Sequence, residues 1–209
     1  HDGHWGTRAM RAYILMAVGF AAAAAAKDKP APPPPAPPPE IIAAPKDPWP
    51  SQYKPYPAQT TVIRGATIYD GAGKRIDGGM IRLEAGRIAE IGATVAIPEG
   101  ARVIDAAGKY VTAGIIDIHS HLGVYPSPGV EAHSDGNEGT SPARPEVWAE
   151  HSVWPQDPGF SRALAGGITA LHVLPGSANL FGGRGTTLKP VYGRSVQEMK
   201  FPGAPYSLK

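Results

Sequence analysis

Residues 114–123 read GIIDIHSHLG, and this stretch decides the fold class. An apolar run, Ile115 to Ile118 with only Asp117 interrupting it, lies between two glycines. Continuous apolar runs bounded by turn residues are typical of strands that are covered on both faces of a parallel sheet. The sequence therefore predicts a fully buried parallel strand, and with it an α/β fold.

Two histidines follow at the end of this predicted strand. Side chains two residues apart on a strand point to the same face, so His119 and His121 can address one point while Ser120 packs the other way. An HxH pair arises often by chance. Here it ends an apolar strand and precedes a glycine and a loop, which is the strand edge where barrel enzymes carry their active sites. The position predicts a metal site with two imidazole ligands.

The residues after this pair predict a parallel crossover. Residues 123–158 are rich in proline and indicate a long loop with at most a short helix near EVWAEHSVW. DPGFSRALAGG then has the pattern of a helix that ends at glycines, and ITALHVLPG that of a second apolar strand. Strand, long connection, helix and strand in this order form a parallel unit.

The residues before the pair divide into three further segments. Residues 1–26 are predicted to be a leader with a secretory signal peptide from Met10, because one Arg, an apolar run and small residues follow one another. Residues 27–59 are a Pro-rich linker that favours extended backbone. Residues 60–113 hold short β-type runs between glycine turns and are predicted to be part of a small β-sandwich, and 114–209 are predicted to hold parallel βα units. We therefore expect a periplasmic or secreted protein with no membrane span after signal cleavage.

Composition narrows the classes of partner and of metal ligand. The net charge is +2, and no basic run interleaved with aromatics is present, so nucleic acid is not an expected partner. The chain has no cysteine, which excludes disulfides and thiolate metal sites. A metal ion would have to be held by His, Asp, Glu or a modified Lys.

The string VTAGIIDIHSHLG at 111–123 resembles the first-strand signature of the metal-dependent amidohydrolase superfamily. VIRGATIYDG and EAGRIAEIG are similar to that family's N-terminal β-sandwich. AGGITALHVLPGSANLFGGRGTTLKPV at 165–191 resembles strand two and its loop in the imidazolonepropionase-like branch. The resemblance covers residues 60–209, which is the whole chain after the linker.

The resemblance implies a (β/α)₈ TIM-type barrel, preceded by the sandwich and incomplete in this chain, with 114–209 as its first βα units. It also implies one or two divalent metal ions, zinc being the first candidate, and hydrolysis of an amide or other C–N bond by an activated water. Cyclic amides, acyl-amino acids and dipeptides are the substrate classes. His119 and His121 match the two first-strand ligands. The general-base Asp of the last barrel strand matches no residue here, so the chain alone is expected to be inactive.

Three more residues carry weaker expectations. Lys209 resembles the start of a segment in which dinuclear members carry a carbamylated lysine between two metal ions. His172 follows strand two, where a structural histidine is the preferred reading over a substrate contact. Arg184, in PGSANLFGGRG, is placed to hold a substrate carboxylate or carbonyl, with a plain glycine-rich turn as the alternative.

Two alternatives to an enzyme stay open at this point. The first is a non-catalytic envelope binding or scaffold protein with a degenerate amidohydrolase barrel. The second is a β-rich envelope protein anchored by residues 10–26, which the parallel-strand pattern after residue 113 disfavours. The substrate, a mono- or dinuclear site and a homo-oligomer are all left undecided by the sequence.

Overall fold

The computed structural model describes residues 47–133 and 136–209. The predicted leader and signal peptide, and the Pro-rich residues 27–46, lie outside the described residues. Within the described ranges, no helix has both the length and the apolar character that crossing a membrane requires.

Residues 61–111 form a five-stranded mixed sheet in the order β3-β2-β1-β4, with β5 also paired to β1. β1 pairs antiparallel with β2, and β2 with β3, whereas β4 and β5 run parallel to β1. The strands are β1 (Thr61–Tyr69), β2 (Arg75–Glu84), β3 (Arg87–Gly92), β4 (Arg102–Asp105) and β5 (Tyr110–Val111).

Local sequence explains this sheet well. The β2–β3 hairpin turns on Ala85 and Gly86, which both have positive φ, as the tight two-residue turns between twisted strands require. Ile68 and Ile81 lie in the buried cluster of the sheet. The described residues place these strands in one sheet, so the second layer of the predicted sandwich stays a prediction.

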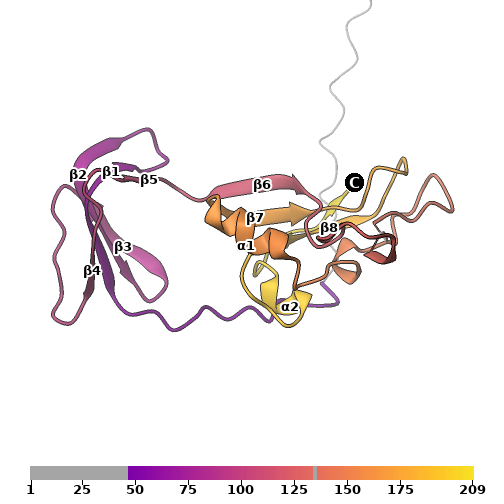
Figure 1. The fold of residues 1–209 in the computed structure, drawn as a ribbon, viewed down its shortest axis with the longest axis horizontal. Helices are drawn as coiled ribbons and strands as arrows, with labels where there is room; N and C mark the ends of the chain where they lie inside the picture. The colour runs from indigo at the N-terminus through magenta and orange to yellow at the C-terminus, as the bar shows by residue number, and fades with distance from the viewer. Residues whose placement is uncertain (1–46, 134–135) are drawn as a thin grey trace, which may run out of the picture. The chain divides into compact units, whose positions relative to one another are not determined.

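Residues 115–208 form a second, four-stranded sheet in the order β6-β7-β8-β9. β6 and β7 run parallel and are joined through α1, as Figure 1 shows, which confirms the predicted crossover. β8 and β9 are antiparallel additions, so among the described strands β6 and β7 are the one parallel pair of this sheet. The elements are β6 (Ile115–Ser120), η1 (Glu131–His133), η2 (Ala149–His151), α1 (Pro158–Ala165), β7 (Ile168–Val173), β8 (Arg184–Leu188), α2 (Val196–Met199) and β9 (Ser207–Leu208).

The core of this second part lies on one side of β7 and β8. Leu171, Val173 and Leu188 are fully buried and pack with Phe160 of α1 and Met199 of α2. The long loop between β6 and α1 contains two single turns of 3-10 helix, η1 and η2, in agreement with the predicted loop.

β6 is not buried as the sequence predicted. Ile115, Ile116 and Ile118 are 54%, 64% and 77% exposed. β6 is the end strand of its sheet and pairs only with β7 among the described residues, so its other edge and much of its surface are uncovered. An apolar strand with an open edge is a surface on which further strands can pair.

Candidate metal centre

The two histidines of the HxH motif lie where β6 ends. His119 is the exposed fifth residue of β6, the buried Ser120 ends the strand, and the half-buried His121 follows it. The imidazole rings meet edge to face with centroids 5.2 Å apart. Zinc binds imidazole nitrogen at about 2.0–2.1 Å, which puts the centroids of two rings on one tetrahedral ion roughly 5 Å apart. The observed separation fits two ligands of one cation.

The ring of His121 is oriented by the main chain immediately after β7. Its Nδ1 lies 2.9 Å from the carbonyl oxygen of Leu174. A carbonyl oxygen only accepts, so Nδ1 carries the hydrogen, and in the neutral ring the lone pair is on Nε2. A metal-binding histidine commonly donates its second nitrogen to a carbonyl in this way. The positions of His119 and His121 therefore fit two ligands of one bound cation.

The described residues supply no complete ligand set. Among them, no cluster of three or more His, Asp or Glu side chains is arranged to hold a metal ion. The carboxylate of Asp117 accepts a hydrogen bond from the backbone N–H of His119 at 3.1 Å, so it supports the end of β6.

Lys209 lies at the same strand edge as His121. Its Nζ donates to the carbonyl oxygen of Pro175 at 2.7 Å, next to the Leu174 carbonyl that accepts from His121. Burial lowers the pKa of the Lys209 ammonium. The backbone of Lys209 is tied to Gly182 and Gly183 by two hydrogen bonds. The chain thus brings the three predicted metal-site residues to one edge of the sheet.

His172 lies inside β7 rather than after it, which corrects the predicted position. Its Nδ1 is 2.9 Å from the Thr187 hydroxyl, and its Nε2 contacts the Ser207 hydroxyl. Burial lowers the pKa of His172, and positive charge on His119 lowers it further. Both ring nitrogens are engaged with neighbouring strands, as expected for a structural histidine.

Arg184 begins β8, and its guanidinium lies over the ring of Trp148, with Cζ 4.7 Å from the centroid. The guanidinium is therefore engaged in a cation–π contact in this state.

Asp157 holds the loop that follows His121. It caps α1 by accepting from Gly159 N at 2.8 Å, and the same carboxylate accepts from Gly123 N at 2.9 Å and Ser127 N at 3.2 Å. The side chain is buried, and Pro158 at the first helical position suits this start of a helix. One carboxylate therefore fixes both the helix and the turn beyond the HxH motif.

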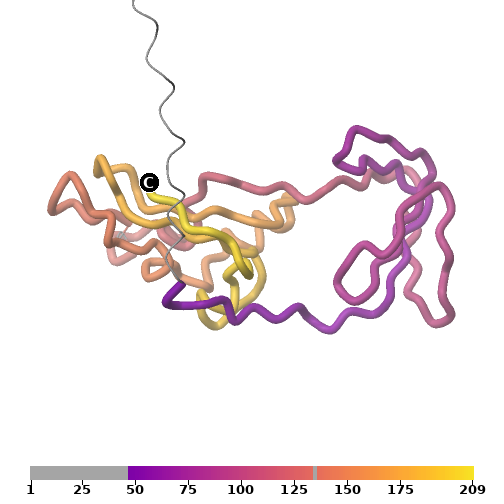
Figure 2. The backbone as a smooth tube through the Cα atoms, turned by 180° about the vertical axis from the view of Figure 1, so that it is seen from behind, coloured from indigo at the N-terminus to yellow at the C-terminus, as the bar shows by residue number. Residues whose placement is uncertain are grey.

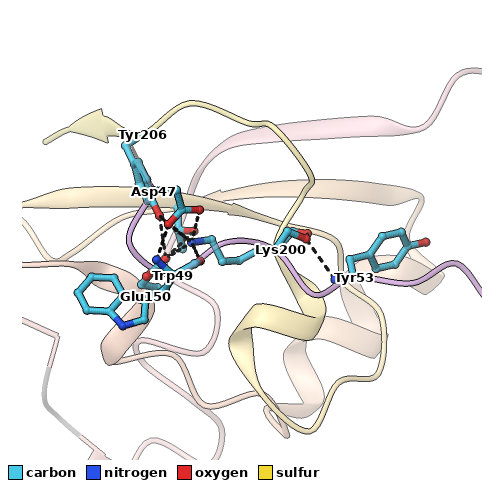
Figure 3. A network of polar contacts seen from close by, with 8 residues as sticks. Asp47, Trp49, Tyr53, Glu150, Lys200 and Tyr206 are labelled. Atoms are coloured by element: carbon cyan, nitrogen blue, oxygen red, sulfur yellow. Dashed lines mark hydrogen bonds and ion pairs between the residues drawn. The ribbon is translucent and has the colours of Figure 1, made fainter. Parts of the chain in front are cut away.

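A buried polar network around Lys200 is the strongest feature that sequence reasoning missed (Figure 3). Lys200 Nζ forms ion pairs with Asp47 at 2.9 Å and Glu150 at 2.7 Å, and it contacts the Tyr206 hydroxyl at 2.6 Å. The side chains of Lys200 and Glu150 are 5% and 0% exposed. We call these four residues the Lys200 network.

The Lys200 network attaches the residues before β1 to the second sheet. Ser51 donates to the carbonyl of Lys200 at 2.7 Å, and Gln52 N to the carbonyl of Gln197 at 2.8 Å. Figure 2 shows this start of the described chain beside the C-terminal segment. The described end of the predicted linker is thus docked. No short sequence motif predicts this docking, because the partners are more than a hundred residues apart in the sequence.

Protonation states follow from this arrangement. Partial burial alone would raise the pKa of Asp47, but hydrogen bonds from Tyr206, Lys200 and the Trp49 N–H outweigh it, so the pKa is lowered. Burial and the neighbouring carboxylates of Asp47 and Glu150 raise the pKa of Tyr206, which keeps its proton. A lowered carboxylate pKa contributes stability at neutral pH that is lost as the pH falls through that pKa.

Two pockets lie near these elements. One of about 530 Å³ is lined by residues of segments 52–56 and 191–198 and contains none of the predicted site residues. The other, of about 460 Å³, is lined by Trp49, residues 136–138, residues 146–149, residues 151–152, Val124 and Pro175. Val124 N–H donates to the carbonyl of His121, and the Pro175 carbonyl accepts from Lys209 Nζ. Because Val124 and Pro175 also line the second pocket, this pocket adjoins the HxH edge.

A parallel β-α-β unit with two imidazoles at the carboxyl edge of its first strand defines an α/β protein with the beginnings of a metal centre. Comparison with known proteins supports this class. The chain is 39% identical over 80 residues to the amidohydrolase tasK of Hapsidospora irregularis, covering 38% of this chain and 8% of that protein. No family model matches the chain.

A solved structure extends the likeness. An amidohydrolase from Thermotoga maritima matches with 34% identity and a TM-score of 0.65 over 71% of this chain and 38% of that one. The chain thus spans well under half of the length of either relative. These likenesses support the amidohydrolase superfamily for this chain; the imidazolonepropionase-like branch stays a prediction.

Proposed function

We propose that the protein to which this chain belongs is a hydrolase that uses a divalent metal ion, zinc first, to cleave an amide or other C–N bond. Cyclic amides, acyl-amino acids and dipeptides are the proposed substrate classes. One observation carries the proposal: in a chain of this superfamily, His119 and His121 end a parallel strand with their rings together, and the Leu174 carbonyl orients His121.

The chain's own residues would divide the work as follows. His119 and His121 would hold the cation, with the Leu174 carbonyl keeping Nε2 of His121 free to bind it. A divalent cation bound there lowers the pKa of a coordinated water toward about 7 and polarises the scissile carbonyl. Asp157 would keep the turn after His121 in place, and the Lys209 amine, held at the Pro175 carbonyl, is the candidate for a carbamate ligand.

The fold that suits this function is a (β/α)₈ barrel preceded by a β-sandwich. The open edge of β6, with its exposed isoleucines, is where a further parallel strand would pair. A closed barrel would bury this strand and surround the two histidines, which excludes bulk water and strengthens electrostatic interactions at the site.

Hydrolysis by the complete protein tests the proposal. We expect turnover of some members of a panel of acyl-amino acids, dipeptides and cyclic amides, its loss after chelation, and its return with zinc, manganese or cobalt. Turnover that survives removal of all bound metal would contradict the metal-dependent mechanism. A protein that binds panel compounds but never turns them over would instead fit the non-catalytic alternative.

We also propose that the protein is exported. Arg11 and the apolar run that follows Met10 support a signal peptide, with the small residues before Lys27 as its cleavage site. Mass spectrometry of protein from the native envelope is expected to find a mature N-terminus near Lys27. Recovery of protein with an intact Met10 from the cytoplasm would refute export.

A further inference from the structure

We propose that the pocket between Trp49 and residues 136–152 binds a positively charged side chain of the substrate, of the guanidinium or ammonium type. This inference rests on the proposed function, because it gives the hydrolytic site a preference for substrates with a basic residue. The pocket has a volume of about 460 Å³, enough for one long side chain, and its walls include Trp49, Asn137, Glu138, Glu146, Trp148 and His151.

A short series of contacts links this pocket to the HxH motif. The side chain of Asn137, in the pocket wall, donates from Nδ2 to the Tyr125 hydroxyl at 2.7 Å. The Tyr125 ring in turn meets the His121 ring edge to face with centroids 5.6 Å apart. A substrate with its scissile bond at His121 can therefore extend a side chain past Tyr125 into the pocket.

The aromatic wall is built around Trp49. Its ring contacts Trp148 and His151 edge to face, with centroids 5.3 Å and 4.4 Å away. Arg184 already covers one face of Trp148, whereas Trp49 keeps 38% of its surface exposed. A tryptophan face is the strongest aromatic partner for a cation, and the apolar stem of a basic side chain packs against the same ring.

The Lys200 network holds Trp49 in place on both sides of its backbone. Asp47 Oδ1 accepts from Trp49 N–H at 2.8 Å, and Lys200 Nζ donates to the Trp49 carbonyl oxygen at 2.6 Å (Figure 3). Buried ion pairs are weak contributors to net stability. This one fixes the position of a partly exposed tryptophan, and a binding surface that is already ordered loses less entropy when a ligand arrives.

The pocket wall offers carboxylates to a bound cation. The carboxylates of Glu138 and Glu146 line the pocket, and none of the described lining residues is Lys or Arg. Arg144 pairs with Glu146 at 3.1 Å from outside the wall and offsets one of the two charges. Hydrogen bonds from Thr140 lower the pKa of Glu138, so this carboxylate is ionised at neutral pH. Arg184 lies over the lining Trp148 and Lys209 Nζ binds the lining Pro175 carbonyl, so the Glu138 carboxylate, rather than a net negative charge of the pocket, is the group that would pair with a bound cation.

Calorimetric titration of the complete, metal-depleted protein tests the inference without any turnover. The probes are Nα-acetyl-L-arginine amide and its neutral near-isostere Nα-acetyl-L-citrulline amide. A cation–π contact together with a carboxylate predicts that the arginine compound binds about tenfold more tightly. The preference should fall to about twofold or less in Trp49→Leu and in the double variant Glu138→Gln/Glu146→Gln, since each removes one of the two terms.

Trp154→Leu is the matched control, because Trp154 is also 38% exposed and lies outside the pocket wall. It should keep the full preference. Equal affinity for the two compounds in the unaltered protein, no binding of either, or a preference that both sets of variants retain would overturn the inference. Metal-dependent hydrolysis without any preference for basic substrates would overturn this inference and leave the proposed function standing. Preferential binding of the arginine compound by a protein that hydrolyses no substrate would support the pocket and contradict the proposed function.

Discussion

Replacing His119 or His121 by Ala in the complete protein is expected to remove bound metal and to lower kcat/KM by more than about 100-fold. Loss of a residue that only supports a ligand typically costs 10- to 100-fold, and these two residues are proposed to be ligands themselves. His121 should give the larger loss of metal affinity, because the Leu174 carbonyl already orients its ring, at 2.9 Å from Nδ1. Metal content by atomic spectrometry and steady-state kinetics measure the two effects.

His133→Ala is the control for these variants. His133 lies in η1, and its ring contacts Trp154, with centroids 5.0 Å apart, rather than the HxH pair. Metal content and kcat/KM should stay within about twofold of the unaltered protein, as for a residue that is neither a ligand nor the partner of one. Unchanged metal content in both His119→Ala and His121→Ala would show that the metal site lies elsewhere.

Lys200→Met is expected to destabilise the protein by about 3–5 kcal/mol, because it leaves the buried Glu150 carboxylate without its cation. Glu150 has a fully buried side chain with one carboxylate oxygen, Oε1, that has no hydrogen-bond partner even in the intact network. Asp47 would lose its anchor as well, so residues 47–53 should detach from the second sheet. Urea-induced unfolding measures the loss of stability, and limited proteolysis reports the release of the segment.

Arg194→Met provides the comparison on α2. Arg194 pairs with Glu198 at 3.0 Å, but its side chain is exposed. Solvent screens an exposed ion pair, which therefore contributes little to stability, so this variant should unfold close to the unaltered protein. A Lys200→Met protein that is as stable as Arg194→Met, with residues 47–53 still protected from protease, would contradict the structural role assigned to the Lys200 network.

Local patterns in the sequence were sufficient for much of the fold. Gly86 marks a hairpin and Gly166 and Gly167 mark the end of α1, because positive φ and helix termination are properties of one or two residues. The crossover from β6 to β7 could be predicted for the same reason, since apolar periodicity and turn residues are local signals. The position of the HxH pair at a strand edge followed directly from it.

The features that the sequence did not predict depend on distant parts of the chain. Ile118 reads as a core residue, but its burial depends on which strands cover β6, and the pattern of β6 itself does not say. Lys200 and Asp47 meet across 153 residues of sequence, and neither has a motif. β7 is followed by the antiparallel strand β8 rather than by another parallel βα unit. This choice also depends on pairing between strands, which local patterns do not determine.

The central claim is that His119 and His121 hold one metal ion, and X-ray absorption at the zinc edge of the complete, zinc-loaded protein tests it most directly. The spectrum should show imidazole nitrogens at about 2.0–2.1 Å from the ion. The number of imidazole ligands should fall by one in His119→Ala and by one in His121→Ala. An identical spectrum in the unaltered protein and in both variants would contradict the claim.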